Sequence, residues 1–413
     1  MIRLSQMILF IACFCLALAL CSCLSSPVQA YGEWPQFLGP NANGFSPEKG
    51  INKDWTKKPP AVLWKFEMSD GGYAGPSVAD GKVFIVDHKE KKDIVRALDL
   101  QTGTEVWNFA YDEAIGNNYG FTRCTPVYNN GKVYTVSRVG MVHCLDAKTG
   151  AKVWVKNIIT DFGGQRPQWD LSMSALVDGD KVILCPGGKD AAVVALNKDT
   201  GATIWKGGGS DMPGYATPVV GIVDGKRQYL VFTGHALIGV NPDNGQLLWS
   251  APWETGCNVN AAAPIITGPN TIFITSGYGH GCELIEVKDN KVTTRWENKN
   301  IEAHFNSALL VGNYVYGKSD FSKGNLVCVN LANGEATWKK DGFEKGGLIG
   351  VDGVYIIMNG RGGDVALANL TPAGYQELGR ITPLGGQSWT APILADKKLI
   401  IRNTKTLACI DLK

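Results

Sequence analysis

Large side chains with polar tips recur at one kind of place in this 413-residue chain, just before short segments that begin with a small residue and often proline. Tyr73, Arg123 and Trp389 each lie three residues before such a proline. Aromatic rings and guanidinium groups anchor ligands on concave surfaces, whereas simple turns favour Gly, Asn or Ser. We predict either a binding site or a set of side chains that plug an opening and satisfy one another. The candidates are Tyr73, Arg123, Trp169, Asp170, Tyr215, Asn260, His304 and Trp389.

Side chains that could bind a metal ion are scattered along the chain. Glu254, Asn258 and Asn260 could supply oxygen ligands and Asp170 could act as a base, but these residue types are also ordinary turn formers. A metal site needs ligands that converge within a few ångströms, and the histidines belong to different repeats. We therefore predict no metal site and assign no catalytic residue. Of the five histidines, His88, His235 and His280 are expected in hairpin loops and His304 before a strand.

An eleven-residue pattern recurs along the chain and must position these side chains. Its first copy has a small residue at Ala97, then Asp99, Gly103 and Trp107. The Asp starts a tight turn by bonding to its own backbone, and the Gly supplies the positive φ that ends the turn. Each tryptophan can dock between neighbouring units and bury a large area, which is a structural role. The docking tryptophans are Trp107, Trp154, Trp205, Trp249 and Trp338, with a degenerate copy at Trp296 and an isolated one at Trp64.

The spacing of the pattern predicts the fold. Successive tryptophans are 42–51 residues apart, and a second turn, such as Asp80-Gly81, divides most units into four short strands. A seventh unit, 348–378, has lost the tryptophan, and the C-terminal unit lacks its fourth strand. The orphan strand at 62–66 fits that vacancy. We predict an all-β fold, an eight-bladed β-propeller whose ring is closed by strands from both ends of the chain.

The eleven-residue pattern resembles the tryptophan-docking motif of pyrroloquinoline-quinone (PQQ)-like propellers. The segment Trp34-Pro-Gln-Phe-Leu-Gly-Pro-Asn41 resembles the lead-in of exported proteins with PQQ-like repeats. That superfamily includes quinoprotein alcohol dehydrogenases and BamB, a propeller lipoprotein of the outer-membrane β-barrel assembly machinery. The resemblance covers residues 34–413 and implies a fold more than an activity, because one fold hosts many functions.

Two functions follow from the resemblance. A BamB-like scaffold would bind an envelope protein, peptide or glycan through its loops without a cofactor. A quinoprotein dehydrogenase would use PQQ and Ca²⁺ on alcohols or sugars, and such enzymes typically carry adjacent, disulfide-bonded cysteines, which this chain lacks. We predict the non-catalytic binding protein and keep the enzyme as the alternative. A formal net charge of +2 with no basic stripe argues against a nucleic-acid partner.

The N-terminus is predicted to direct export. Residues 1–30 carry one charge, Arg3, then 14 apolar residues, and end on Val28-Gln29-Ala30, a small-residue cleavage site. The apolar stretch is short for a spanning helix, which needs about 20 residues. A membrane anchor and a lipid anchor at Cys23 are the alternatives, and no later stretch could span a bilayer. We divide the chain into a signal peptide (1–30), a lead-in segment (31–61) and a propeller (62–413), placed in the periplasm, at the outer membrane or outside the cell.

Seven cysteines follow residue 30. Cys144, Cys328 and Cys409 occupy the same slot of different repeats and are expected to act as small buried hydrophobes. Cys257 and Cys282 are expected on the same face of one blade. They could form a disulfide if their Cα atoms lie within about 7 Å, and the alternative is two free thiols.

Overall fold

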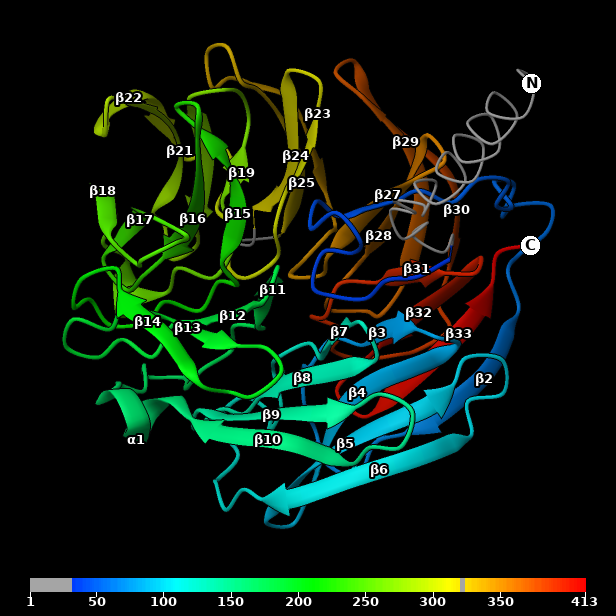
Figure 1. The fold of residues 1–413 in the computed structure, drawn as a ribbon. Coiled ribbons are helices and arrows are strands. Elements are labelled where there is room, and N and C mark those ends of the chain that lie inside the picture. The colour runs from blue at the N-terminus through cyan, green and yellow to red at the C-terminus, as the bar shows by residue number, and fades with distance from the viewer. Residues whose placement is uncertain (1–31, 320–323) are drawn as a thin grey trace, which may run out of the picture. The chain divides into compact units, whose positions relative to one another are not determined.

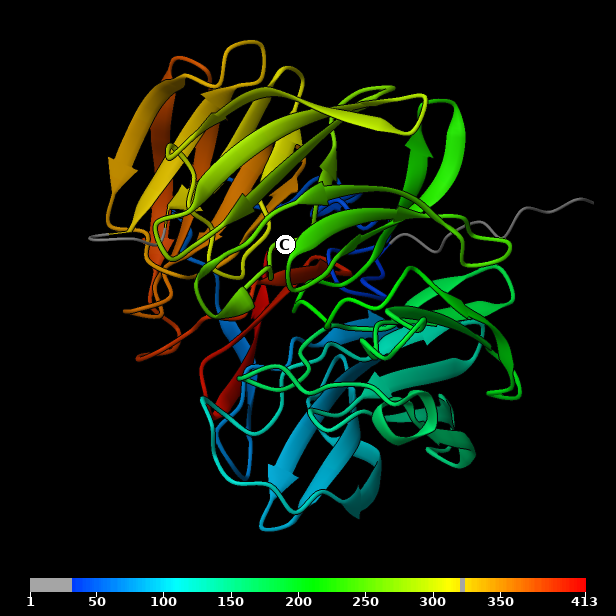
Figure 2. The same ribbon diagram turned by 90° about the vertical axis from the view of Figure 1, so that its left-hand side faces the viewer.

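Eight sheets make up the described chain, all antiparallel except for one added parallel strand. The computed structural model describes residues 32–319 and 324–413, and the predicted signal peptide with Cys23 lies outside them. The sheets, each of four or five strands, are arranged around a common centre (Figures 1 and 2). The predicted all-β, eight-bladed β-propeller is therefore confirmed. Helix in these residues is confined to α1 (Ile158–Phe162) and the 3₁₀ turn η1 (Gly256–Asn258), and neither could cross a bilayer.

Seven blades use four consecutive strands, ordered from the centre of the ring to its rim. Blades 1 to 4 contain β3 (Ser77–Ala79), β4 (Lys82–Lys89), β5 (Lys92–Asp99), β6 (Glu105–Asp112); β7 (Val127–Asn129), β8 (Lys132–Val136), β9 (Met141–Asp146), β10 (Lys152–Asn157); β11 (Leu176–Asp178), β12 (Lys181–Leu184), β13 (Val193–Asn197), β14 (Thr203–Gly207); and β15 (Val219–Val223), β16 (Lys226–Phe232), β17 (Ala236–Val240), β18 (Leu247–Pro252). Blades 5 to 7 contain β19 (Ile265–Ile266), β20 (Thr271–Ser276), β21 (Gly281–Lys288), β22 (Lys291–Asn298); β23 (Leu309–Val311), β24 (Tyr314–Ser319), β25 (Asn325–Asn330), β26 (Ala336–Asp341); and β27 (Leu348–Val351), β28 (Val354–Met358), β29 (Val365–Thr371), β30 (Gly374–Ile381).

Blade 8 is built from both ends of the described chain. Its inner strands are β31 (Ile393–Ala395), β32 (Lys398–Arg402) and β33 (Thr406–Asp411), and its rim strand is β2 (Val62–Glu67). β2 pairs antiparallel with β33, with Trp64 opposite Cys409. The predicted closure of the ring by the orphan strand is therefore confirmed.

Five of the seven docking tryptophans join their blade to the next one in the same way. The indole N–H of Trp64 donates to the carbonyl of Leu100 in blade 1 (3.0 Å), and its ring covers Gly103, whose φ is +72°. A Cβ at Gly103 would lie 2.6 Å from that ring, so only glycine fits there. Trp107, Trp154, Trp205 and Trp296 donate in the same way to Ala147, Lys198, Pro242 and Leu331.

Two tryptophans depart from this scheme because the next blade lacks the turn glycine at the usual spacing. Trp249 donates instead to Gln228 Oε1 of its own blade (2.7 Å). Trp338 donates to the carbonyl of Thr371 (2.7 Å) but has no turn glycine to cover, and its ring stays half-exposed. The docking geometry thus follows the pattern wherever the pattern is complete.

The lead-in segment lies against the inner strands at the centre of the ring. Trp34 exchanges backbone hydrogen bonds with Val78 of blade 1, and Pro35 accepts one from Tyr128 N of blade 2 (2.8 Å). Further on, β1 (Phe45–Ser46) pairs in parallel with β27 and becomes a fifth strand of blade 7 (dark blue in Figure 1). The segment predicted only as a lead-in is therefore part of the propeller core.

The cysteines of the described chain are all free thiols. The disulfide considered between Cys257 and Cys282 is not formed: Cys257 is exposed on η1, whereas Cys282 is buried with its Sγ 3.3 Å from Asn298 Oδ1. Cys144, Cys328 and Cys409 are fully buried, each opposite a docking tryptophan.

We expect a maleimide to label Cys257 in the native protein and the six other described cysteines only after unfolding. Burial raises the pKa of the Cys124, Cys185 and Cys282 thiols to about 12, so the reactive thiolate is scarce in addition to being inaccessible. Peptide mapping by mass spectrometry after pulse labelling measures this. A cross-linked peptide containing Cys257 and Cys282 would contradict it.

Candidate functional site

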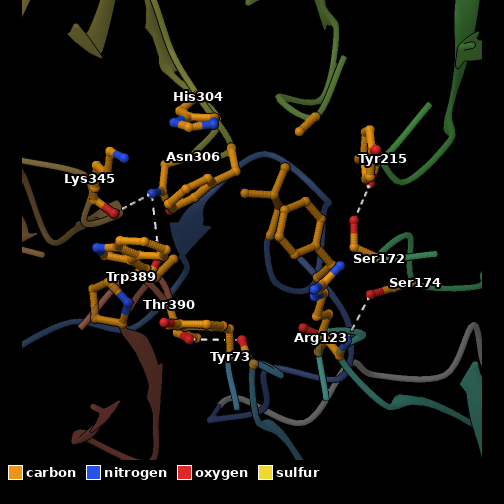
Figure 3. Close-up of a pocket in the computed structure, with 18 of the residues that line it drawn as sticks. Tyr73, Arg123, Ser172, Ser174, Tyr215, His304, Asn306, Lys345, Trp389 and Thr390 are labelled. Carbon is orange, nitrogen blue, oxygen red and sulfur yellow. Dashed lines mark hydrogen bonds between the residues drawn. The ribbon is translucent and has the colours of Figure 1, made fainter. Parts of the chain in front are cut away.

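A cavity of about 440 Å³ lies at the centre of the ring, within the size range of small-molecule sites. In most blades a proline leads into the inner strand, and in the others a different residue takes its position. Each blade contributes to the cavity the residue three positions before this one. We call these eight residues the wall. They are Tyr73, Arg123, Ser172, Tyr215, Ala261, Phe305, Lys345 and Trp389, most of which are labelled in Figure 3.

The lead-in segment supplies the apolar floor of the cavity. Trp34, Phe37 and Leu38 line it together with the wall. Gly39 allows the turn that presents them, because its φ is +81° and a Cβ there would lie 3.0 Å from the Trp34 ring. The cavity is therefore backed by the chain's own N-terminal segment at this point.

Six of the eight predicted site residues line the cavity: Tyr73, Arg123, Trp169, Tyr215, His304 and Trp389. The placement of the other two at the cavity is wrong. Asn260 is fully buried, and its amide donates to the carbonyls of Thr233 and Gly234. It lies between Val259 and Ala261, which both line the cavity, so its own side chain points to the opposite side, as alternate side chains do in extended backbone. Asp170 is buried behind the wall, where it pairs with Arg138 and Arg166.

Seven rings form a nearly continuous aromatic belt around the cavity. Neighbouring centroids are 4.6–6.4 Å apart, a spacing typical of favourable aromatic pairs. Burial and the nearby Lys345 lower the pKa of His304 to about 4, so its imidazole is neutral at neutral pH. In order, the belt is Tyr73, Trp389, Phe305, His304, Tyr278, Trp169 and Tyr215.

Hydroxyl groups bind successive blades together just beneath the belt. The backbone N–H of Thr125 donates to Ser174 Oγ in the next blade (2.9 Å), and the N–H of Ser174 donates in turn to Thr217 Oγ1 (2.9 Å). On the other side, Thr390 Oγ1 donates to the carbonyl of Tyr73 (2.8 Å). These bonds fix the wall, and they also occupy hydroxyls that would otherwise face a ligand.

The charged residues that line the cavity are both cations. Lys345 Nζ lies 4.9 Å from the centroid of the Trp389 ring, a cation–π contact. Arg123 lies on the other side of the cavity from Lys345 and Trp389 (Figure 3). Among the described residues, no carboxylate and no cysteine lines the cavity. The site therefore combines aromatic surface with excess positive charge.

The residues considered as metal ligands do not converge. Glu254 is exposed, while Asn258 Nδ2 lies 3.3 Å from Met212 Sδ. No group of three or more His, Cys, Asp or Glu side chains in the described part of the chain could hold a metal ion. His88, expected in a loop, lies within β4 and is buried, with Nδ1 2.8 Å from Asp93 Oδ1.

Several lining residues were not among the candidates. Phe305 and Lys345 obey the same three-residue offset as Tyr73, so the signal was present in the sequence. This signal is hard to see because blades 6 and 7 have no proline before the inner strand, and blade 7 has also lost its tryptophan. Phe37 and Leu38 come from outside the repeats, and no repeat alignment could have indicated them.

The ring of docking tryptophans defines a PQQ-like β-propeller. The family described as outer membrane protein assembly factor BamB matches residues 90–340, and the chain belongs to this family. BamB of Salmonella typhimurium is 24% identical over 336 residues, which are 76% of this chain and 81% of that protein.

Quinoprotein dehydrogenases are similar over shorter stretches. The quinohemoprotein alcohol dehydrogenase of Comamonas testosteroni is 31% identical over 157 residues, 35% of this chain and 21% of that enzyme. The matched part spans about a fifth to a quarter of the curated dehydrogenases that head the comparison. The crystal structure of the Comamonas testosteroni enzyme superposes with a TM-score of 0.70 at 15% identity, over 92% of this chain and 80% of that one. BamB from Moraxella catarrhalis gives 0.60 at 18% identity, over 85% and 99%. These superpositions establish the shared fold alone.

Proposed function

We propose that this protein is a non-catalytic binding protein of the cell envelope that holds part of its ligand or partner in the central cavity. The observation that carries the proposal is the composition of the cavity: a belt of seven aromatic rings and two cations, with no acidic or thiol side chain among the described lining residues. Aromatic and arginine side chains are the usual anchors of binding sites, and the described lining offers no carboxylate or thiol for acid–base or nucleophilic chemistry.

The location is part of the same proposal. The apolar stretch and cleavage site in residues 1–30 support export, although they lie outside the described residues. The name of the matching family, an outer membrane protein assembly factor, is consistent with an envelope location. An envelope protein, a peptide or a glycan remain the partners that we consider.

The dehydrogenase alternative finds less support in the residues of the cavity. Ca²⁺ takes six to eight oxygen ligands, and protein sites for it usually include carboxylates. The described lining has no carboxylate. Asp170, the residue considered as a possible base, is already paired with two arginines. The residues present do not fit a cofactor held through Ca²⁺. Stoichiometric binding of PQQ with Ca²⁺ and dye reduction with alcohols or sugars would nevertheless overturn the scaffold proposal.

Photo-crosslinking from the cavity tests the proposal directly. Tyr119 lines the cavity and is 65% exposed, while Ile222, 62% exposed, lies at the far end of inner strand β15. With a benzophenone amino acid at each position in turn, we expect a discrete adduct in envelope extract from position 119 but not from 222. Equal capture at both positions, or at neither, would contradict a site in the cavity.

Substitution of the wall supplies the second test. We expect Arg123→Ala and Trp389→Ala to reduce this capture about 10-fold or more with little change in melting temperature, because both side chains are only partly covered by protein. Arg295→Ala and Val106→Ala on exposed rim strands are the matched controls. A large fall in melting temperature with unchanged capture would show that the wall is structural packing.

A further inference from the structure

Three arginines gather on one side of the cavity, and one of them, Arg123, has no ion pair among the described residues. Arg138 and Arg166 both pair with Asp170, each at 2.5 Å, and Arg123 lies close enough to feel Arg138 and Asp170 electrostatically. Three arginines thus share one carboxylate. Glu113 lies near Arg138 and Arg166, and Asp93 lies near Arg138, so carboxylates and arginines are equal in number, but neither Glu113 nor Asp93 forms an ion pair with Arg123. Burial makes a guanidinium without an ion pair costly unless an anion offsets its charge.

Arg123 is the member of this group that faces the cavity. Its Nη2 donates to the carbonyls of Asn118 and Tyr119, which fixes the guanidinium on the loop before β7. Nε and Nη1 have no hydrogen-bond partner, and the side chain no ion pair, among the described residues. Burial and the neighbouring Arg138 lower its pKa to about 10, so it stays protonated at neutral pH. A fixed, charged guanidinium with unused donors suits a carboxylate or sulfonate.

The other polar groups of the cavity restrict the ligand further. Ser172 Oγ donates to the carbonyl of Tyr215, and the Asn306 amide donates to the carbonyls of Lys345 and Trp389 (Figure 3). With Ser174 and Thr390 also engaged between blades, the strongest group left over is the Arg123 guanidinium, which is charged and can only donate. The hydroxyls of a neutral sugar could hydrogen-bond to it but would bring no counter-charge. An acceptor-rich anion with an apolar body matches the site better.

We propose that the cavity binds a small aromatic acid, with its anionic group on Arg123 and its ring against the aromatic belt. The proposal rests on the proposed function, because it names the ligand class of the same site. A charge-assisted hydrogen bond from Nε or Nη1 would give Arg123 its preference for an anion, and the belt would contribute affinity that does not depend on charge. Lys345, three blades away, adds to the positive potential of the cavity.

Two fluorescent probes that differ by one charge test this. 8-Anilinonaphthalene-1-sulfonate and N-phenyl-1-naphthylamine share the same rings, and only the first carries a sulfonate. We expect saturable one-to-one binding of the anionic dye, about 10-fold or more tighter than that of the neutral dye. Benzoate should displace the anionic dye, whereas benzyl alcohol at the same concentration should not, which extends the result from sulfonate to carboxylate without any variant.

Variants locate the anionic group. Arg123→Gln should weaken binding of the anionic dye about 10- to 100-fold and leave the neutral dye unchanged, since one charge-assisted contact is lost. Trp389→Ala should weaken both dyes, and Arg295→Gln neither. Unchanged neutral-dye binding also shows that Arg123→Gln is folded.

Three results would overturn the inference: equal affinity for the two dyes, unaltered binding of the anionic dye to Arg123→Gln, or no saturable binding of either dye. None of these results bears on whether the photo-crosslinker at position 119 captures a partner. Failure of the aromatic-acid proposal is therefore distinguishable from failure of the proposed function.

Discussion

Removal of residues 32–66 is expected to destroy the cooperative fold of the propeller. The deletion takes away β2, and with it the strand that pairs with the full length of β33. It also removes the Trp64 ring that covers Gly103, and it removes Trp34, Phe37 and Leu38, which form the floor of the cavity. An exposed edge in a sheet invites pairing with other chains. We expect oligomers or aggregates by size-exclusion chromatography and loss of a single sharp transition by calorimetry.

A point substitution gives a graded version of the same test. Trp64→Ala should lower the free energy of unfolding by about 3–5 kcal/mol, because it removes a buried ring and its hydrogen bond to Leu100. Leu63→Ala, on the exposed side of the same strand, should change it by less than about 0.5 kcal/mol. A monomeric truncated protein with an unaltered melting transition would refute the closure of blade 8 by β2.

The fold could be predicted from the sequence because its information is local and repeated. The turn from Asp99 to Gly103 needs a side chain that bonds its own backbone and a residue at positive φ, and both leave a signature in a few positions. Repetition at propeller spacing then fixes the number of blades. Even the composite blade was predictable, since Trp64 is a docking tryptophan without a motif of its own in front of it.

The site was predictable only in the repeats where a proline marks the start of the inner strand and so fixes the alignment. Tyr73, Arg123, Tyr215 and Trp389 lie three residues before a proline, and all four line the cavity. Where the proline is missing, the register is lost: Ser172, Phe305 and Lys345 hold the equivalent positions but were not among the candidates. Asn260 shows the sensitivity of the argument, because a shift by one residue moves a side chain from the cavity wall into the blade.

Two features of the site could not have come from the sequence. The floor formed by Phe37 and Leu38 depends on where a non-repetitive segment runs through the ring. The sharing of Asp170 among arginines depends on three loops meeting in space. Neither relation has a fixed spacing, so neither leaves a pattern that a single sequence can show.

Asp170→Asn is expected to destabilise the protein by about 3–5 kcal/mol. The Asp170 side chain is 7% exposed and that of Arg138 is 2% exposed, so the substitution leaves a buried guanidinium without its counter-charge. Arg166 and Arg123 add like charge to the same region. Chemical denaturation at neutral pH measures the loss. Asp199→Asn is the matched control: Asp199 pairs with Lys132 at 2.5 Å, but its side chain is 52% exposed, so we expect little change in the denaturation midpoint.

A double mutant separates loss of the ion pair from simple loss of packing. With Arg138→Gln added, the unpaired charge created by Asp170→Asn disappears, so the double mutant should cost at least about 1 kcal/mol less than the sum of the two single mutants. The same reasoning links stability to the ligand. Asp170→Asn removes a competitor for the arginines, so the anionic dye should bind this variant more tightly than it binds the unaltered protein. Additive costs in the cycle, or weaker dye binding to folded Asp170→Asn, would show that the three arginines do not act as one charged group.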